Sequence, residues 1–407
     1  MADYKVIKGG VTSARGFRAA GVAAEIKYQG RNDVALIVAD EPCAAAAVFT
    51  TNKVAAAPVL YDREVVRGGR VQAILANSGC ANACTGEEGL KDAKLSALVT
   101  AGELGIDPGR VLVASTGVIG RRLPMERLLA GMKKAKAALG ASFEHGLAAE
   151  KAVMTTDTKP KQAAVVCTID GRKVTIGGMS KGSGMIEPNM ATMLGFLTTD
   201  AAVSPRLLKR ALQLAIGRSF NRLVVDGDES TNDSVFLLAS GKAGNREISS
   251  SSGRDFEIFV KALTAVCVSL ARQMATDGEG ATKFVTVTVR GAKNERDAER
   301  AARAVAKSPL AKTSWFGRDP NWGRVLAAVG YSGAEVVDMK AEVFYDRVWA
   351  FRCGRIADER QLAKLAAVMK KDEFTVTVDL HLGEAEASIY TCDFSLDYVH
   401  INADYTT

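Results

Sequence analysis

The chain has 407 residues, 47% of them hydrophobic, so it can bury large cores and is long enough for two or three domain-sized units. Its 53 basic and 46 acidic residues are interspersed and leave a net charge of +7, without the basic run flanked by aromatic residues that would indicate nucleic-acid binding. We find no apolar segment of membrane-spanning length and no apolar signal-peptide core at the start, so we expect a cytosolic protein.

Short apolar runs that end in polar or glycine turns alternate along the chain with helical patterns, which is typical of an α/β protein. An Asp170-Gly171 pair between two such runs predicts a β-hairpin. No proline- or serine-rich linker divides the chain, so we expect its two halves to form one interlocked body. In chain order, we predict strands at 34–38, 71–75 and 111–114, a helix from Leu123 to about Ala138, hairpin strands at 164–169 and 173–176, helices at 207–216 and 259–274, a strand at 284–290, a helix at 298–307 and a strand at 374–379.

Histidine is scarce, which limits the choice of catalytic chemistry. The three histidines, His145, His381 and His400, are far apart, and none sits in the setting that a Ser-His-Asp or Cys-His enzyme needs. Seven cysteines are scattered, and the close pair Cys80 and Cys84 has no second pair or nearby histidine to complete a zinc site. We therefore expect reduced thiols, no metal, and a nucleophile that brings its own base.

One glycine-rich segment, Lys181-Gly-Ser-Gly-Met-Ile-Glu-Pro-Asn-Met-Ala-Thr-Met-Leu194, places a hydroxyl residue in an unusual setting. Its glycines let the backbone approach another group closely, Pro188 fixes φ, and the small Ala191 leaves room around the peptide bond to Thr192. A threonine that cleaves this bond becomes N-terminal, and its amine, with a pKa of about 7.7–8.0, can take the proton of its own hydroxyl. The alternative is that Thr192 opens a buried strand after a loop.

This segment resembles the self-cleavage segment of the ornithine acetyltransferase family, also called the glutamate N-acetyltransferase or ArgJ family. The similarity extends over essentially the whole chain, and the other motifs follow the family's order. They are Gly10-Val-Thr-Ser-Ala14, Phe49-Thr-Thr-Asn52, Ala76-Asn-Ser-Gly79, Ser115-Thr-Gly-Val-Ile-Gly120, Met154-Thr-Thr-Asp-Thr158, Asp226-Gly-Asp228, Ser230-Thr-Asn-Asp233, Gly278-Glu-Gly280, Asp319-Pro-Asn-Trp-Gly-Arg324 and the C-terminal tail.

The resemblance implies a fold, an activity and an assembly. The fold is a layered α/β sandwich of the self-processing ArgJ/DmpA-like type. It is cleaved between Ala191 and Thr192 into an α chain, 1–191, and a β chain, 192–407, which assemble as an α2β2 heterotetramer. The activity is transfer of the acetyl group of N-acetylornithine to glutamate through an acetyl-Thr192 ester, in arginine biosynthesis. Exchange of one amide for another needs no metal, nucleotide or redox cofactor, and the resemblance leaves open whether acetyl-CoA is a further acetyl donor.

Four residues take site roles by their match to the family's motifs. Thr116 and Gly117 would form the oxyanion hole, Lys181 would bind a substrate carboxylate, and Glu279 would bind a substrate ammonium. Judged from the residues alone, each has an ordinary alternative. Thr116 and Gly117 could form a tight turn, Lys181 could be a solvated loop lysine, and Glu279 could be a surface residue in a turn after a helix.

The substrate contacts that the resemblance adds are Thr155, Thr192 itself, Asn402 and Thr407. Chain ends usually fray, so the last two would not be chosen without the resemblance. Two other functions stay open. The same self-cleaved threonine could serve an amidohydrolase or aminopeptidase with water as acceptor, or the Lys181 loop could belong to a non-catalytic small-molecule binder. We expect small-molecule substrates and no nucleic-acid or membrane partner.

Overall fold

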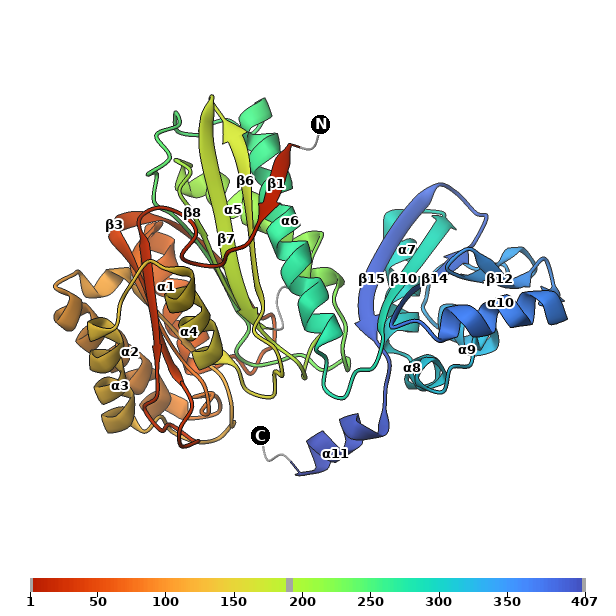
Figure 1. The fold of residues 1–407 in the computed structure, drawn as a ribbon, viewed down its shortest axis with the longest axis horizontal. Helices are drawn as coiled ribbons and strands as arrows, with labels where there is room; N and C mark the ends of the chain where they lie inside the picture. Colours follow the sequence, from red (N-terminus) through yellow and green to blue (C-terminus); the bar gives the residue numbers. More distant parts are fainter. Residues whose placement is uncertain (1–2, 188–192, 405–407) are drawn as a thin grey trace.

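The computed structural model describes residues 3–187 and 193–404, which form two lobes of unequal size (Figure 1). In these residues the large lobe contains a nine-stranded sheet and the small lobe a six-stranded one. The strands of the large lobe are β1 (Tyr4–Ile7), β2 (Phe17–Val22), β3 (Val34–Phe49), β4 (Arg70–Asn77), β5 (Val111–Ser115), β6 (Gln162–Ile169), β7 (Arg172–Lys181), β8 (Leu194–Thr199) and β9 (Ser234–Ala239). Its helices are α1 (Ala57–Val65), α2 (Gly86–Leu104), α3 (Met125–Ala137), α4 (Phe143–Val153), α5 (Pro205–Gly217) and α6 (Arg254–Thr276).

The large sheet lies between helices, because side chains that alternate along its strands are buried on both of its faces. On one face, apolar side chains pack against α2 and α3 near β4 and β5, and against α5 and α6 near β6 to β9. The alternate side chains, on the other face, form one continuous core that includes α4. The predicted layered α/β sandwich is therefore confirmed.

The predicted helices and strands are present, and the strand predicted at 34–38 is much longer in the structure than expected. β6 and β7 form the expected hairpin, with Asp170 and Gly171 both at positive φ, 49° and 69°, as a two-residue turn of this type requires. The strand predicted at 34–38 continues to Phe49, past a bulge between Val38 and Cys43. Its second part is rich in alanine, so it carries no alternation of apolar and polar residues that would indicate a strand.

The segments before and after the predicted cleavage point share this one sheet. Its strand order is β1-β6-β7-β8-β9-β3-β4-β5, so β8 and β9 lie between β7 and β3. β8 pairs with β7 in an antiparallel ladder, and β9 pairs with β3 in the same way. Strands from 3–187 and from 193–404 are thus interleaved in one sheet, and the break between these ranges does not coincide with the boundary between the lobes.

The small lobe begins at β10 and ends with a helix that returns to the large lobe (Figure 1). The sheet order is β13-β12-β11-β14-β10-β15, and helices α7 to α10 accompany it. Its strands are β10 (Phe284–Ala292), β11 (Glu342–Tyr345), β12 (Val348–Arg352), β13 (Arg355–Ile356), β14 (Glu373–Asp379) and β15 (Ala385–Cys392). Its helices are α7 (Glu295–Lys307), α8 (Pro309–Phe316), α9 (Trp322–Gly330) and α10 (Glu359–Met369), and the returning helix is α11 (Leu396–Asp404).

The expectation that no apolar segment reaches membrane-spanning length needs a correction. Helix α6 is long and apolar enough to cross a membrane by length and composition alone. It is instead a core helix of the large lobe, where Phe259, Leu263, Leu270 and Met274 are fully buried.

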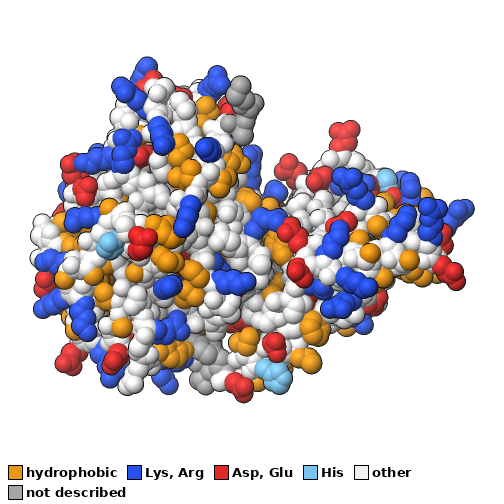
Figure 2. All heavy atoms as spheres, in the orientation of Figure 1, with side chains coloured by type: hydrophobic (Ala, Val, Ile, Leu, Met, Phe, Trp, Pro, Cys, Tyr) orange, Lys and Arg blue, Asp and Glu red, His pale blue; other side chains and the backbone are white. Residues whose placement is uncertain are grey.

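Figure 2 shows basic, acidic and apolar side chains intermixed over one face of the molecule, without one dominant basic patch.

Candidate active site

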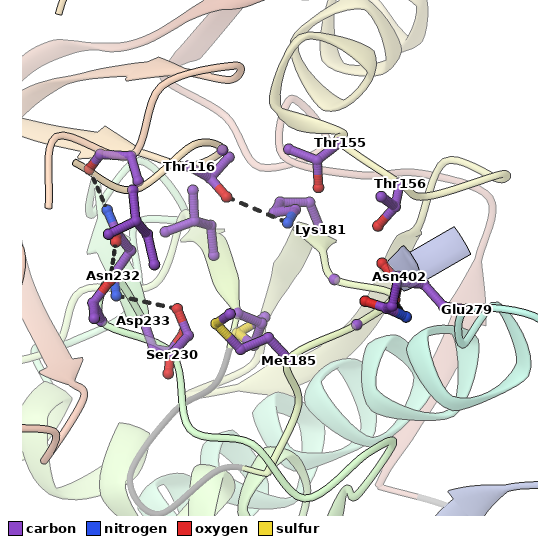
Figure 3. Close-up of a pocket in the computed structure, with 18 residues that line it drawn as sticks. Thr116, Thr155, Thr156, Lys181, Met185, Ser230, Asn232, Asp233, Glu279 and Asn402 are labelled. Atoms are coloured by element: carbon purple, nitrogen blue, oxygen red, sulfur yellow. Dashed lines mark hydrogen bonds between the residues drawn. The ribbon is translucent and has the colours of Figure 1, made fainter. Parts of the chain in front are cut away.

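One cavity gathers the predicted site residues that the structure describes (Figure 3). Thr116, Gly117, Thr155, Lys181, Glu279 and Asn402 all line it, although they come from segments far apart in the chain. Met193 and Leu194, which directly follow the predicted nucleophile in sequence, also line it. Three predicted positions, Ala191, Thr192 and Thr407, lie outside the described residues.

The turn after β5 is shaped so that only glycine fits at its second position. Gly117 has a φ of 127°, and a Cβ there would lie 2.5 Å from the carbonyl carbon of Gly79. The N–H of Thr116 donates to the carbonyl oxygen of Asn77 at 3.0 Å, so this amide is already occupied. The group that Thr116 presents to the cavity is its hydroxyl, which lies beside Lys181 in Figure 3.

Lys181 is a buried cation rather than a solvated loop residue. It is the last residue of β7, and it is 8% exposed. Its Nζ lies 3.4 Å from the Thr116 hydroxyl oxygen, and it forms no ion pair within 4.0 Å among residues 3–187 and 193–404. A buried charge without a direct counter-ion is costly, so an incoming carboxylate would be favoured at this position.

Glu279 forms an acidic wall of the same cavity. It is also 8% exposed, and its carboxylate accepts a hydrogen bond of 2.8 Å from the side-chain amide of Asn402 on α11. Its backbone N–H donates to the carbonyl oxygen of Ser183 at 2.9 Å, which ties it to the glycine-rich loop. A Cβ on Gly184 would lie 2.3 Å from the Glu279 carboxyl carbon, so a larger residue there would displace the Glu279 side chain.

A buried ionic cluster behind the cavity contacts two of its walls, and no motif in the sequence marked it as part of a site. Lys161 is fully enclosed, and its Nζ lies 2.7 Å from Asp157 and 2.6 Å from Asp277. Asp157 also accepts the N–H groups of Gly182 and Thr155, at 2.7 and 3.0 Å. Burial alone would raise the pKa of Asp157, but the positive charges of Lys181 and Lys161 lower it to about 2.

Two further cavity residues were missed, although their motif was noticed. The side-chain amide of Asn232, just before β9, donates to the carbonyl oxygens of Ala81 and Ser115, at 2.6 and 2.8 Å, which connects the start of β9 to the end of β5. Burial raises the pKa of Asp233 well above its usual range, and a hydrogen bond from Ser230 and the charge of Lys181 only partly offset this. A carboxyl group enclosed among polar neighbours is the signal that could have marked this motif as part of a site.

The chain is similar to known proteins along nearly its whole length. The ArgJ family model matches residues 18–407. "Arginine biosynthesis bifunctional protein ArgJ" of Geobacter sulfurreducens is 52% identical, over 97% of this chain and 100% of its own length. "Glutamate N-acetyltransferase" of Methanocaldococcus jannaschii is 46% identical, over 99% of this chain and 100% of its own length. A solved ornithine acetyltransferase from Mycobacterium tuberculosis, complexed with ornithine, is 43% identical over 46% of this chain and 100% of that chain, with a TM-score of 0.44. The match of the family model and of relatives along their full length shows that this chain belongs to the ArgJ family.

Proposed function

We propose that this enzyme transfers the acetyl group of N-acetylornithine to glutamate in arginine biosynthesis, through an acetyl ester on Thr192. The observation that carries this is the distribution of charge in the cavity. Lys181 is a buried cation beside the Thr116 hydroxyl, and Glu279 is a buried carboxylate on another wall (Figure 3). N-acetylornithine carries its carboxylate and its acetamide on the same carbon and its ammonium at the far end of the side chain. A cation next to the oxyanion donor and an anion further away therefore complement its charges.

Acetyl transfer would then proceed in two steps. The α-amine of Thr192 takes the proton of its own hydroxyl, whose oxygen attacks the acetyl carbon. The hydroxyl of Thr116, together with Gly117, stabilises the negative oxygen that develops. Ornithine leaves with the proton, and the amine of glutamate then attacks the acetyl-Thr192 ester to give N-acetylglutamate. Lys181 would bind the carboxylate of either amino acid, which explains how one site serves donor and acceptor in turn.

We assign the remaining contacts and partners in the same way. Thr155 and Asn402 line the cavity and would contact the substrate, with Thr407 completing the set. The exchange consumes one amide and forms another, so it requires no metal or redox cofactor, and acetyl-CoA would act only as an additional acetyl donor. The enzyme would work in the cytosol as two self-cleaved chains, in an α2β2 assembly. The shared sheet supports such a pairing of chains, since β8 and β9 insert between β7 and β3.

The test combines maturation with partial reactions. We expect mass spectrometry of the purified protein to find one fragment ending at residue 191 and another beginning Thr-Met-Leu-Gly-Phe, while Thr192→Ala stays a single, inactive chain. N-acetylornithine should acetylate the second fragment in a burst, and turnover should depend on glutamate. Release of acetate without an amine acceptor would favour an amidohydrolase, and an intact, fully active wild-type chain would refute the mechanism. Acetyl-CoA offered in place of N-acetylornithine reports whether it is a second donor.

A further inference from the structure

Within the cleavage segment, the residues before the predicted cleavage point are held by groups that do not line the cavity. The Asp226 carboxylate accepts the N–H groups of Met185 and Ile186, at 2.5 and 2.8 Å. The carbonyl oxygen of Ile186 in turn accepts the N–H of Val225 at 2.7 Å. Met185 is kept at a φ of 54°, which a side-chain-bearing residue rarely adopts without such support. The chain is therefore fixed on both sides of Ile186.

The next residue, Glu187, is paired with the small lobe. Its carboxylate lies 2.5 Å from the Nζ of Lys307 and 3.8 Å from the guanidinium of Arg303, both on α7. The Glu187 side chain is 9% exposed, so this contact is largely shielded from solvent on the acidic side. Glu187 does not line the cavity, and neither does Lys307. This pair connects the segment before the predicted cleavage point to a lobe that supplies neither the oxyanion turn nor Lys181.

We propose that the Glu187–Lys307 ion pair positions the precursor for self-cleavage and has no role in acetyl transfer by the mature enzyme. The inference rests on the proposed self-cleavage at Ala191-Thr192. In that step the Thr192 hydroxyl oxygen attacks the Ala191 carbonyl carbon, the C–N bond breaks, and the hydroxyl proton passes to the new amine. Water then hydrolyses the ester, which leaves a carboxylic acid on Ala191 and frees the hydroxyl of Thr192.

The separation of roles follows from which end of the segment the pair holds. Before cleavage, the carbonyl that is attacked belongs to the Glu187 side and the attacking hydroxyl to the β8 side, so both sides must be fixed for the two atoms to meet. The Glu187 ion pair adds a side-chain anchor to the side that carries the attacked carbonyl, beyond the backbone hydrogen bonds of Ile186. After cleavage, the nucleophile belongs only to the β8 side, which is secured by the ladder from Lys181 and Leu194 onward.

The experiment follows maturation of the full chain after pulse-labelled synthesis. Lys307→Met and Glu187→Gln should each slow appearance of the second fragment roughly 10- to 100-fold, the range expected for a misplacement of about 1 Å. Lys307→Arg should restore most of the rate. The double variant should cleave no more slowly than either single one, since all three lack the same contact. Lys293→Met is the matched control, because Lys293 pairs with Glu335 at 2.6 Å on the same lobe, away from the cleavage segment.

The activity of the cleaved variants separates a role in maturation from a role in catalysis. Once cleaved, the Lys307→Met and Glu187→Gln enzymes should show wild-type kcat and KM. Cleavage of both variants at the wild-type rate overturns the proposal, and so does an equal loss of kcat in the mature enzyme, which would indicate a general structural role. Lys307→Met leaves the buried Glu187 carboxylate without this partner and could slow cleavage through misfolding. Glu187→Gln removes the carboxylate itself, so it breaks the same ion pair without leaving a buried unpaired charge. A wild-type chain that is never cleaved would instead refute the proposed maturation itself.

Discussion

The buried carboxylate of Asp157 allows a quantitative test of how the site is held. It is fully shielded from solvent, pairs with Lys161 and accepts the N–H groups of Gly182 and Thr155. Asp157→Asn keeps the shape but removes the charge, and it turns one acceptor into a donor. The pKa of Asp157 falls from 3.8 to about 2 in the folded protein. At about 1.36 kcal/mol per pKa unit, the variant should lose roughly 2 kcal/mol of unfolding free energy at pH 7. Hydrogen bonds to a charged group, worth about 1.5–3 kcal/mol, give a similar figure.

The loss should depend on pH in one direction. A carboxylate whose folded-state pKa is lowered stabilises the protein above its unfolded pKa, and this contribution disappears as the pH falls through the folded pKa. For Asp157 the window runs from the usual 3.8 down to about 2. The difference in unfolding free energy between wild type and Asp157→Asn should therefore be nearly constant from pH 7 to pH 5. It should fall to roughly half near pH 3.

Urea unfolding at several pH values measures this difference, and steady-state kinetics measures its effect on the site. Because Thr155 lines the cavity and loses an acceptor for its N–H, the KM for N-acetylornithine should rise in Asp157→Asn. Asp200→Asn is the matched control, since the Asp200 side chain is as buried as that of Asp157 and accepts the backbone N–H of Thr175, but Thr175 does not line the cavity. It should destabilise the protein without changing KM. A loss that is the same at pH 7 and pH 3, or a KM no higher than in the control, would refute this reasoning.

Three other substitutions probe the cavity directly. Thr116→Ala should slow self-cleavage and turnover by roughly 10²–10³, because the backbone N–H of Thr116 is already bonded and only its hydroxyl can donate to the oxyanion. Unchanged rates in a gel-based cleavage assay and a turnover assay would exclude Thr116 from the site. Glu279→Gln should still mature into two fragments, yet raise the KM for N-acetylornithine more than it lowers kcat; an unchanged KM would make this glutamate structural. Gly184→Ala places a Cβ 2.3 Å from the Glu279 carboxyl carbon and should raise the same KM, and a wild-type KM would mean that the loop can move aside.

The local elements could be predicted because each depends on neighbouring residues. The Asp170-Gly171 turn fixes the hairpin of β6 and β7 wherever it lies in the protein. The second part of β3 was missed, because its alanines become strand residues only through pairing with β9. The length indicated two or three domain-sized units, but the position of the boundary between the two lobes was not predicted. The turn that leads into β10 contains no linker-like sequence. It is held by hydrogen bonds such as the one that the Ser395 hydroxyl donates to the carbonyl oxygen of Gly280.

Six residues that line the cavity were named from the sequence, but nothing in the sequence predicted how they come together. β5 and β7 are separated by several strands in the sheet order, so no spacing in the sequence places Thr116 beside Lys181. The resemblance supplied these residues one by one, and Asn402 was the least expected, because it lies near a chain end. Its position depends on α11 returning to the large lobe, where its amide meets Glu279. Lys161 had no signal at all, since a single lysine reads as a solvated residue until its partners are known.

The sheet explains how a chain could be cut next to its nucleophile without falling apart. Lys181 and Leu194 are opposite each other in the β7–β8 ladder, so the whole cleavage segment leaves and re-enters the sheet at one place. Breaking the bond at Thr192 would remove a loop constraint, but none of the ladder hydrogen bonds or the apolar core that β8 shares with β7 and β9. The new amine would then be fixed by β8, which follows it, while Lys181 at the end of β7 and Thr116 after β5 would stay in place on the other chain. The proposed cleavage would therefore add a base to the site while leaving the sheet intact, and this base would take the role that histidine plays in other acyl-transfer enzymes.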